Sequence, residues 1–203
     1  MCYLKGNTSA FHISLMNRIV FLIIFIFQLF HTHSSEHINF LGLNVSGDME
    51  QFKDSLIKKD FIYVESFESS FKLLGKFANE IVTLTVLATP KSKTVCKVIV
   101  EFPIKRSWKD LKNDYFAKKN LYKLKYTLDK DFEFFSLPYE EGDGYELKAV
   151  MRNKCTYASF FLAIGGYITV KIDETARIKV TYEDKQNLKI AQQELEQSAI
   201  DDI

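Results

Sequence analysis

The densest set of side chains that could do chemistry lies in residues 139–146, which read Tyr-Glu-Glu-Gly-Asp-Gly-Tyr-Glu. Glu140, Glu141, Asp143 and Glu146 offer carboxylate oxygens, the ligands that hard cations such as calcium prefer. Their spacing is not that of an EF-hand loop. Acids separated by glycines between strands are typical of a solvated turn. We therefore treat these four residues as candidate binding residues and expect no metal site and no cofactor.

The same acids carry the only enzymatic alternative, a carboxylate-dependent hydrolase using Glu140, Glu141 and Asp143. Glycoside hydrolysis needs two carboxyl groups about 5–10 Å apart across a cleft. No partner acid elsewhere in the chain stands out, so the sequence favours a loop over a catalytic centre.

The histidines argue against nucleophilic catalysis. The chain has four, His12, His31, His33 and His37, all in or just after an N-terminal leader. Ser-His-Asp and Cys-His systems need a positioned imidazole base. Because His37 is expected at a loose N-terminus, we expect no catalytic residues and no enzyme activity.

The leader is the apolar run Ile19–Phe30, which follows Arg18 and precedes small polar residues. A membrane-spanning helix needs about 20 apolar residues, whereas a short apolar run after a basic residue is typical of a secretory signal. We predict that residues 1–35 form a cleaved signal peptide, with residues 1–15 an extension ahead of the true start at Met16. An uncleaved anchor and a buried helix are the alternatives. The mature protein is expected outside the cytoplasm, with membrane contact only through this segment before cleavage.

Composition limits the classes of partner. Without residues 1–35 the chain keeps 25 basic and 26 acidic side chains. A basic excess, the usual mark of nucleic-acid binding, is missing, so no nucleic-acid partner is expected. The whole chain has 18 Phe and 10 Tyr but three Pro, a composition that favours strands.

Two cysteines follow the leader, Cys96 and Cys155. In an exported protein they could form a disulfide, which would stabilise by about 4 kcal/mol in the chain-entropy model. Both lie in apolar, strand-like runs, so two buried thiols are the alternative.

The helices and strands that must position these residues are indicated by the spacing of the apolar residues, which changes along the chain between a helical period and a strand period. Apolar residues at helical spacing predict a helix over 49–60, capped by Ser46 or Asp48. A second helix begins at Ser107, with an apolar stripe expected in the core and Lys118 and Lys119 on a solvated face. Period-two patterns predict strands at 61–65, 71–78, 81–88, 95–102, 132–136, 145–151, 156–164, 167–172 and 177–182.

Further local signals complete the plan. Gly165-Gly166 is typical of a two-residue hairpin turn, and residues 185–203 predict a polar helical tail. Strand runs segregated from helices indicate an α+β fold with antiparallel sheets and helices on one face. We predict two helix-then-strands halves, 36–105 and 106–184.

Short motifs carry a family resemblance. Phe40-Leu41-Gly42-Leu43 with Val45-Ser46-Gly47 resembles the opening of small secreted proteins of unknown function from Gram-negative gut bacteria. Tyr182-Glu183-Asp184-Lys185 and the terminal Ile200-Asp201-Asp202-Ile203 are similar to their ends. The element order also resembles the beta-lactamase-inhibitor-protein fold and the small outer-membrane assembly lipoproteins that share it, although no lipidation cysteine follows the leader. This second resemblance implies a fold only.

Export without a catalytic set leads to a functional hypothesis. We expect a non-enzymatic extracytoplasmic binding or interaction module that holds a protein or envelope ligand on an aromatic-rich sheet face or its loops. A cell-envelope assembly component and the carboxylate hydrolase are the alternatives.

Overall fold

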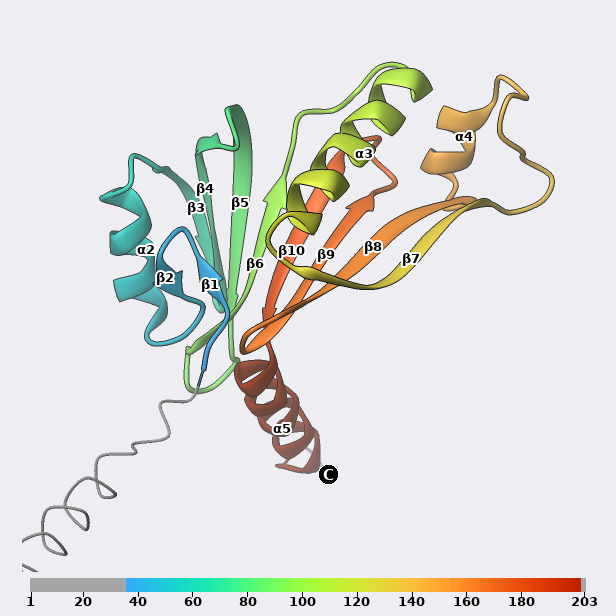
Figure 1. Ribbon diagram of the computed structural model, residues 1–203. Helices are drawn as coiled ribbons and strands as arrows, with labels where there is room; N and C mark the ends of the chain where they lie inside the picture. Colours follow the sequence, from blue (N-terminus) through green and yellow to red (C-terminus); the bar gives the residue numbers. More distant parts are fainter. Residues whose placement is uncertain (1–35, 202–203) are drawn as a thin grey trace, which may run out of the picture. The chain divides into compact units, whose positions relative to one another are not determined.

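A computed structural model describes residues 36–201 (Figure 1). The predicted signal peptide lies outside these residues. The described elements, in chain order, are β1 (Asn39–Phe40), β2 (Leu43–Asn44), α2 (Met49–Ile57), β3 (Ile62–Phe67), β4 (Ser70–Phe77), β5 (Glu80–Ala88), β6 (Val95–Glu101), α3 (Trp108–Lys123), β7 (Thr127–Phe135), α4 (Glu146–Met151), β8 (Cys155–Ala163), β9 (Gly166–Ile172), β10 (Ile178–Asp184) and α5 (Lys185–Asp201).

One eight-stranded antiparallel sheet dominates the fold, in the order β3-β4-β5-β6-β10-β9-β8-β7. Every neighbouring pair is antiparallel. The predicted α+β class with an antiparallel sheet is therefore confirmed. β6 and β10 pair at the centre, while β3 and β7 are the edges.

Strand periodicity divides the sheet into a covered face and an open face, because successive side chains point to opposite sides. One row of paired residues crosses the covered face: Tyr63, Leu73, Leu84, Val100, Val180, Val170, Ser159 and Asp131. From Leu73 to Ser159 this row is fully buried. The adjacent row on the open face contains no buried residue: Ile62, Leu74, Thr83, Glu101, Lys179, Lys171, Ala158 and Phe132.

Helices α2 and α3 pack on the covered face. The Asp48 carboxylate accepts hydrogen bonds from the first turn of α2, which settles the choice of cap in favour of Asp48. Ser107 caps α3 by accepting from the Asp110 backbone N–H, as predicted. Both helices bury apolar stripes that complete the core, from Met49, Phe52 and Leu56 of α2 and from Leu111, Tyr115 and Tyr122 of α3.

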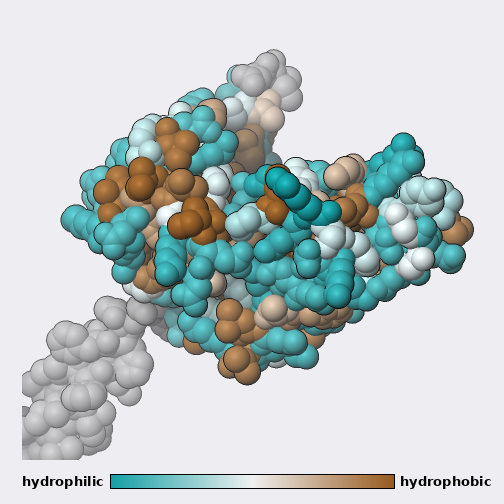
Figure 2. Space-filling model, turned by 90° about the horizontal axis from the view of Figure 1, so that it is seen from above, coloured by the Kyte–Doolittle hydropathy of each residue, from teal (hydrophilic) through white to brown (hydrophobic). Residues whose placement is uncertain are grey.

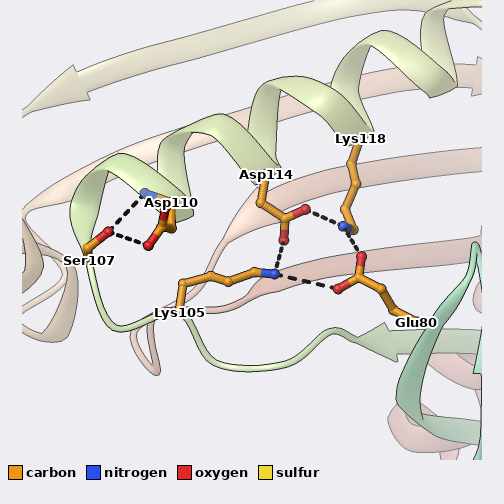
Figure 3. Close-up of polar contacts among 6 residues, drawn as sticks. All are labelled: Glu80, Lys105, Ser107, Asp110, Asp114 and Lys118. Atoms are coloured by element: carbon orange, nitrogen blue, oxygen red, sulfur yellow. Dashed lines mark hydrogen bonds and ion pairs between the residues drawn. The ribbon is translucent and has the colours of Figure 1, made fainter.

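A cycle of opposite charges connects α3 to Glu80 of β5 and to Lys105, which follows β6 (Figure 3). Lys118 contacts Glu80 at 2.7 Å and also pairs with Asp114. Lys105 contacts the same two carboxylates, at 3.5 and 3.2 Å. The Lys118 ammonium also lies 4.0 Å from the centre of the Phe102 ring. The network connects α3 to β5 and to the segment that follows β6.

The prediction of a solvated face at Lys118 and Lys119 is wrong. Their exposed fractions are 6% and 8%. Lys119 pairs with Asp131 and Glu133 of β7. Sequence periodicity sorts charges to the outside, but ion pairs with carboxylates from β5 and β7 let both ammonium groups be buried.

One predicted strand is a helix. Residues 145–151 show a short apolar run, and α4 covers Glu146–Met151. Short apolar runs do not distinguish a strand from a helix by periodicity. The predicted hairpin between β8 and β9 is present, but its two turn residues are Ile164 and Gly165, with Gly165 at φ +77°, and Gly166 already belongs to β9.

The tail helix α5 leaves the end of β10 and extends past the end of the sheet (Figure 1). Of its side chains only Asn187 is buried, where its amide donates to the carbonyls of Val45 and Val95. Between residues 36 and 201, no helix combines the length and the apolar character needed to cross a membrane.

Candidate functional site

The open face has an apolar groove at its β7–β9 end, with a volume of about 460 Å³. Its apolar lining includes Phe132, Phe160, Leu162 and Tyr167, which are 43%, 36%, 45% and 41% exposed. The rings of Phe132 and Phe160 meet edge-on with centroids 6.0 Å apart. Large apolar groups gathered in one exposed groove are typical of a surface that binds a partner.

A second apolar area lies at the opposite end of the open face. Ile62, Leu74 and Ile81 are 67%, 40% and 59% exposed, and Phe67 of the edge strand β3 is 54% exposed. Viewed from above, apolar side chains gather on the side of α2, β3 and β4 (Figure 2). The polar centre of the open face therefore lies between two apolar ends.

Charge on the open face is partly neutralised within the molecule. Lys97 pairs with Glu183 at 2.5 Å, and Lys179 with Glu101 at 3.3 Å. Three lysines of this face have no carboxylate partner among residues 36–201: Lys76, Lys130 and Lys171. Asp129, at the bulge in β7, is an exposed acid beside the groove. The charges left unpaired are thus mainly positive.

The structure does not bring the four candidate acids of the 139–146 loop to one point. Glu141 pairs with Lys112 of α3 and accepts a hydrogen bond from the Tyr157 hydroxyl at 3.2 Å. The hydrogen bond from Lys112 lowers the pKa of Glu141. Glu141 therefore attaches the loop to α3.

The other three acids serve the loop itself or face solvent. Asp143 accepts from the backbone N–H groups of Glu140 and Tyr145, at 3.0 and 2.6 Å. Glu146 accepts from the Gly142 N–H at 2.9 Å. The side chain of Glu140 is exposed. Across the described residues there is no cluster of three or more potential metal ligands.

Cys96 and Cys155 are free thiols, so of the two alternatives that the sequence left open the structure has the thiols and not the disulfide. Cys96 lies on β6 and Cys155 on β8, with β10 and β9 between them. Three strand spacings of about 4.8 Å place the two backbones far beyond the roughly 7 Å limit for a disulfide. The order of the strands in the sheet, which the sequence does not reveal, therefore keeps the two sulfurs too far apart to form a disulfide.

The prediction that His37 lies at a loose N-terminus is also wrong. Its Nδ1 lies 2.9 Å from Oδ2 of Asp184, whose side chain is fully buried, and its Nε2 lies 3.4 Å from the Ser46 hydroxyl. Serine, histidine and aspartate are thus in the order of a catalytic triad.

The surroundings of this constellation indicate a structural role. Asp184 also accepts from the backbone N–H groups of Ile38 and Asn187, at 3.2 and 2.9 Å. It therefore caps α5 and holds the N-terminal segment against β10.

Comparison of the chain with protein-family models, with curated proteins and with solved structures gave no match.

Sequence reasoning named the sheet face in general but missed the groove residues. The signal was present in β8, where Tyr157 and Phe161 point to the covered face while Phe160 and Leu162 point to the open face. When the side chains on both sides of a strand are apolar, one set faces the core, and the other set stays exposed unless a second layer covers it. The open-face residues of β8 were therefore detectable in principle.

Proposed function

We propose that this chain is an exported, non-enzymatic binding module that holds a partner protein on the open face of its sheet. The observation that carries the proposal is the β7–β9 groove, whose apolar lining is exposed although the opposite face of β8 and β9 is buried in the core. Aromatic side chains in a groove supply much of the binding free energy at protein interfaces.

The partner's chemistry follows from the open face. The groove accepts apolar side chains, and the unpaired Lys130 and Lys171 beside it favour carboxylates. Complementary charge mainly increases the association rate and the specificity. The partner is therefore a protein segment with aromatic or aliphatic anchors flanked by acidic residues.

We also propose that the sheet is built from two halves of similar plan, α2 with β3–β6 and α3 with β7–β10. The strand order supports this, because the last strand of each half, β6 and β10, lies at the centre and the first strand of each lies at an edge. The resemblance to the beta-lactamase-inhibitor-protein fold and to small secreted proteins of gut bacteria belongs to this proposal.

Export rests on the apolar run Ile19–Phe30 after Arg18. N-terminal sequencing of the protein recovered from outside the cytoplasm is expected to start close to Glu36. Material that still begins at Met1 or Met16 would refute cleavage, and purely cytoplasmic recovery would refute export.

The two alternatives lack a supporting observation of their own. The hydrolase would need Glu140, Glu141 and Asp143 to face a common substrate, whereas Glu141 and Asp143 are engaged within the protein. An envelope assembly component would use the same open face, and the identity of the partner distinguishes it.

A site-specific photocrosslinker tests the proposed function. Placed at Phe160 in the living cell, it should give one discrete adduct, with the crosslink mapping to an acidic segment that carries apolar anchors. Phe132→Ser should reduce the adduct, and the crosslinker at Leu195, exposed on α5, is the control. Equal adducts from both positions, or an adduct to a basic polar segment, would rule out the open face as the binding surface.

A further inference from the structure

A separate cleft of about 400 Å³ opens on the helical side of the molecule, between the C-terminal end of α3 and two hairpin turns. Its floor is aromatic: Phe102, Tyr122 and Tyr182 are at most 6% exposed, and the two tyrosine hydroxyls meet at 2.5 Å. Tyr126 stacks on Tyr122 with ring centroids 5.9 Å apart. The volume lies within the range of about 300–1,000 Å³ found for small-molecule sites.

The mouth of the cleft is also apolar. Leu121 and Leu124 of the α3 end are 53% and 85% exposed, and Leu41 of the β1–β2 turn is 38% exposed. Exposure of these apolar side chains to water is unfavourable in free energy, and an apolar ligand that covered them would remove this cost.

Two hairpin turns form one side of the mouth. Leu41 and Gly42 of the β1–β2 turn, and Ala78 and Asn79 of the β4–β5 turn, all have positive φ, as a two-residue type I′ turn requires. The β1–β2 turn thereby places a leucine at the edge of the cleft.

A second cavity of about 480 Å³ adjoins the first, because Asn39, Lys125 and Tyr126 line both. The two together form a longer groove with Lys125 at the junction. Lys125 is exposed and has no carboxylate partner among the described residues. Lys118, the other lysine of the cleft, is already neutralised by Glu80 and Asp114.

We propose that this groove binds a single-chain anionic amphiphile, with the acyl chain on the aromatic floor and the carboxylate or phosphate head at Lys125. The apolar floor selects a hydrocarbon chain, and the one unneutralised cation selects the sign of the head. Binding here is independent of a partner on the open face, which lies on the other side of the sheet.

The test titrates the purified exported protein, recovered after the proposed cleavage near Glu36, with dodecanoate below its micelle concentration, monitored by calorimetry and by displacement of anilinonaphthalene sulfonate. Dodecyltrimethylammonium, with the same chain and a cationic head, should bind at least several-fold more weakly. Lys125→Gln should weaken dodecanoate about three- to tenfold, as expected for a partly exposed charge-assisted contact. Lys123→Gln, an exposed lysine of the same helix end that lines neither cavity, should change nothing.

Further arms identify the source of the ligand and protect against misfolding. Leu124→Asp changes a side chain that the fold leaves exposed and should abolish dodecanoate binding with an unchanged circular dichroism spectrum. Vesicles of phosphatidylglycerol distinguish a membrane lipid from a free amphiphile, since either can supply the head group. Failure of both dodecanoate and the vesicles to bind overturns the proposal, as does equal binding of the cationic amphiphile. Neither result affects crosslinking at Phe160.

Discussion

The imidazole of His37 and the carboxylate of Asp184 meet at 2.9 Å although 147 positions separate them in the chain. The contact connects the first described residues to the junction of β10 and α5. Asp184 is fully buried and accepts three hydrogen bonds from nitrogen donors, from His37, Ile38 and Asn187. Such a carboxylate holds together segments that would otherwise separate.

Replacing Asp184 by alanine is therefore expected to be costly. The change removes the α5 cap and leaves buried N–H groups without an acceptor, so we expect a loss of about 2–4 kcal/mol in the free energy of unfolding. Urea denaturation measures it. The matched control is Glu183→Ala, which breaks only the open-face pair with Lys97 and should cost at most about 1 kcal/mol. Equal losses in the two variants would contradict the structural role.

Ser46 is expected to be unreactive despite its contact with His37. A fluorophosphonate probe, which phosphonylates activated serines with loss of fluoride, should leave Ser46 unmodified in the folded protein, because His37 and Asp184 hold the N-terminal segment and α5 in place. Mass spectrometry of the treated protein gives the answer. Labelling at Ser46 that His37→Ala abolishes would instead establish a nucleophile and overturn the non-enzymatic proposal.

Lys118 should contribute to stability through its ion pairs. Lys118→Met leaves Glu80 and Asp114 with Lys105 as their remaining cation (Figure 3). We expect the free energy of unfolding to fall by about 1–3 kcal/mol. Lys123→Met, an exposed position of the same helix, should change it by at most about 0.5 kcal/mol. A solvated Lys118 would make the two variants indistinguishable.

The protein should lose stability in acid partly through Asp131. Burial alone would raise the pKa of Asp131, but hydrogen bonds from Lys119 and Ser159 outweigh it and lower the pKa from the ordinary 3.8. A carboxyl group with a lowered folded-state pKa stabilises fully above its unfolded pKa, and this contribution disappears as the pH falls through the folded value.

Asp131→Asn should therefore flatten the acid limb of a plot of unfolding free energy against pH, below about pH 4. Urea titrations from neutral to strongly acidic pH measure this slope. Asp129→Asn, two residues away at an exposed position, serves as the control and should leave the slope as in the wild type. An unchanged slope in Asp131→Asn would show that the contacts with Lys119 and Ser159 contribute nothing.

Both cysteines should be present as slow-reacting thiols. Burial raises the pKa of Cys96 to about 11 and that of Cys155 to about 12. Because the thiolate is the reactive form, iodoacetamide at mildly alkaline pH should modify the folded protein slowly. In denaturant without reductant, both should be alkylated at once. A mass showing two protected sulfurs in that sample would restore the disulfide and contradict the sheet order.

Much of the local structure could be predicted because it depends on local rules. The Ser107 cap, the apolar stripe of α3 and the Gly165 turn need only neighbours in sequence. The error at residues 145–151 has the same origin, since six or seven residues are too few for periodicity to separate a helix from a strand.

The errors at Lys118 and His37, and the question left open at Cys96 and Cys155, have another cause. Each depends on a residue distant in the chain that the sheet order brings close or keeps away. Sequence gives the sign of a charge but not its partner, so a buried lysine is indistinguishable from a solvated one. For the same reason, the sequence could not show that Glu141 of the 139–146 loop pairs with Lys112 of α3.

By itself, the sequence determined the class of the fold, the approximate positions of most helices and strands and the alternation that builds a packed face, because these follow from residue type and period. Only the tertiary structure decided which faces stay uncovered. Pairing of β6 with β10 joins all eight strands into one sheet, whose open face leaves the Phe132–Phe160 groove exposed. The packing of α3 against the hairpin turns creates the aromatic cleft beside Lys125. Both candidate sites exist through contacts between distant segments, and those contacts cannot be deduced from local patterns.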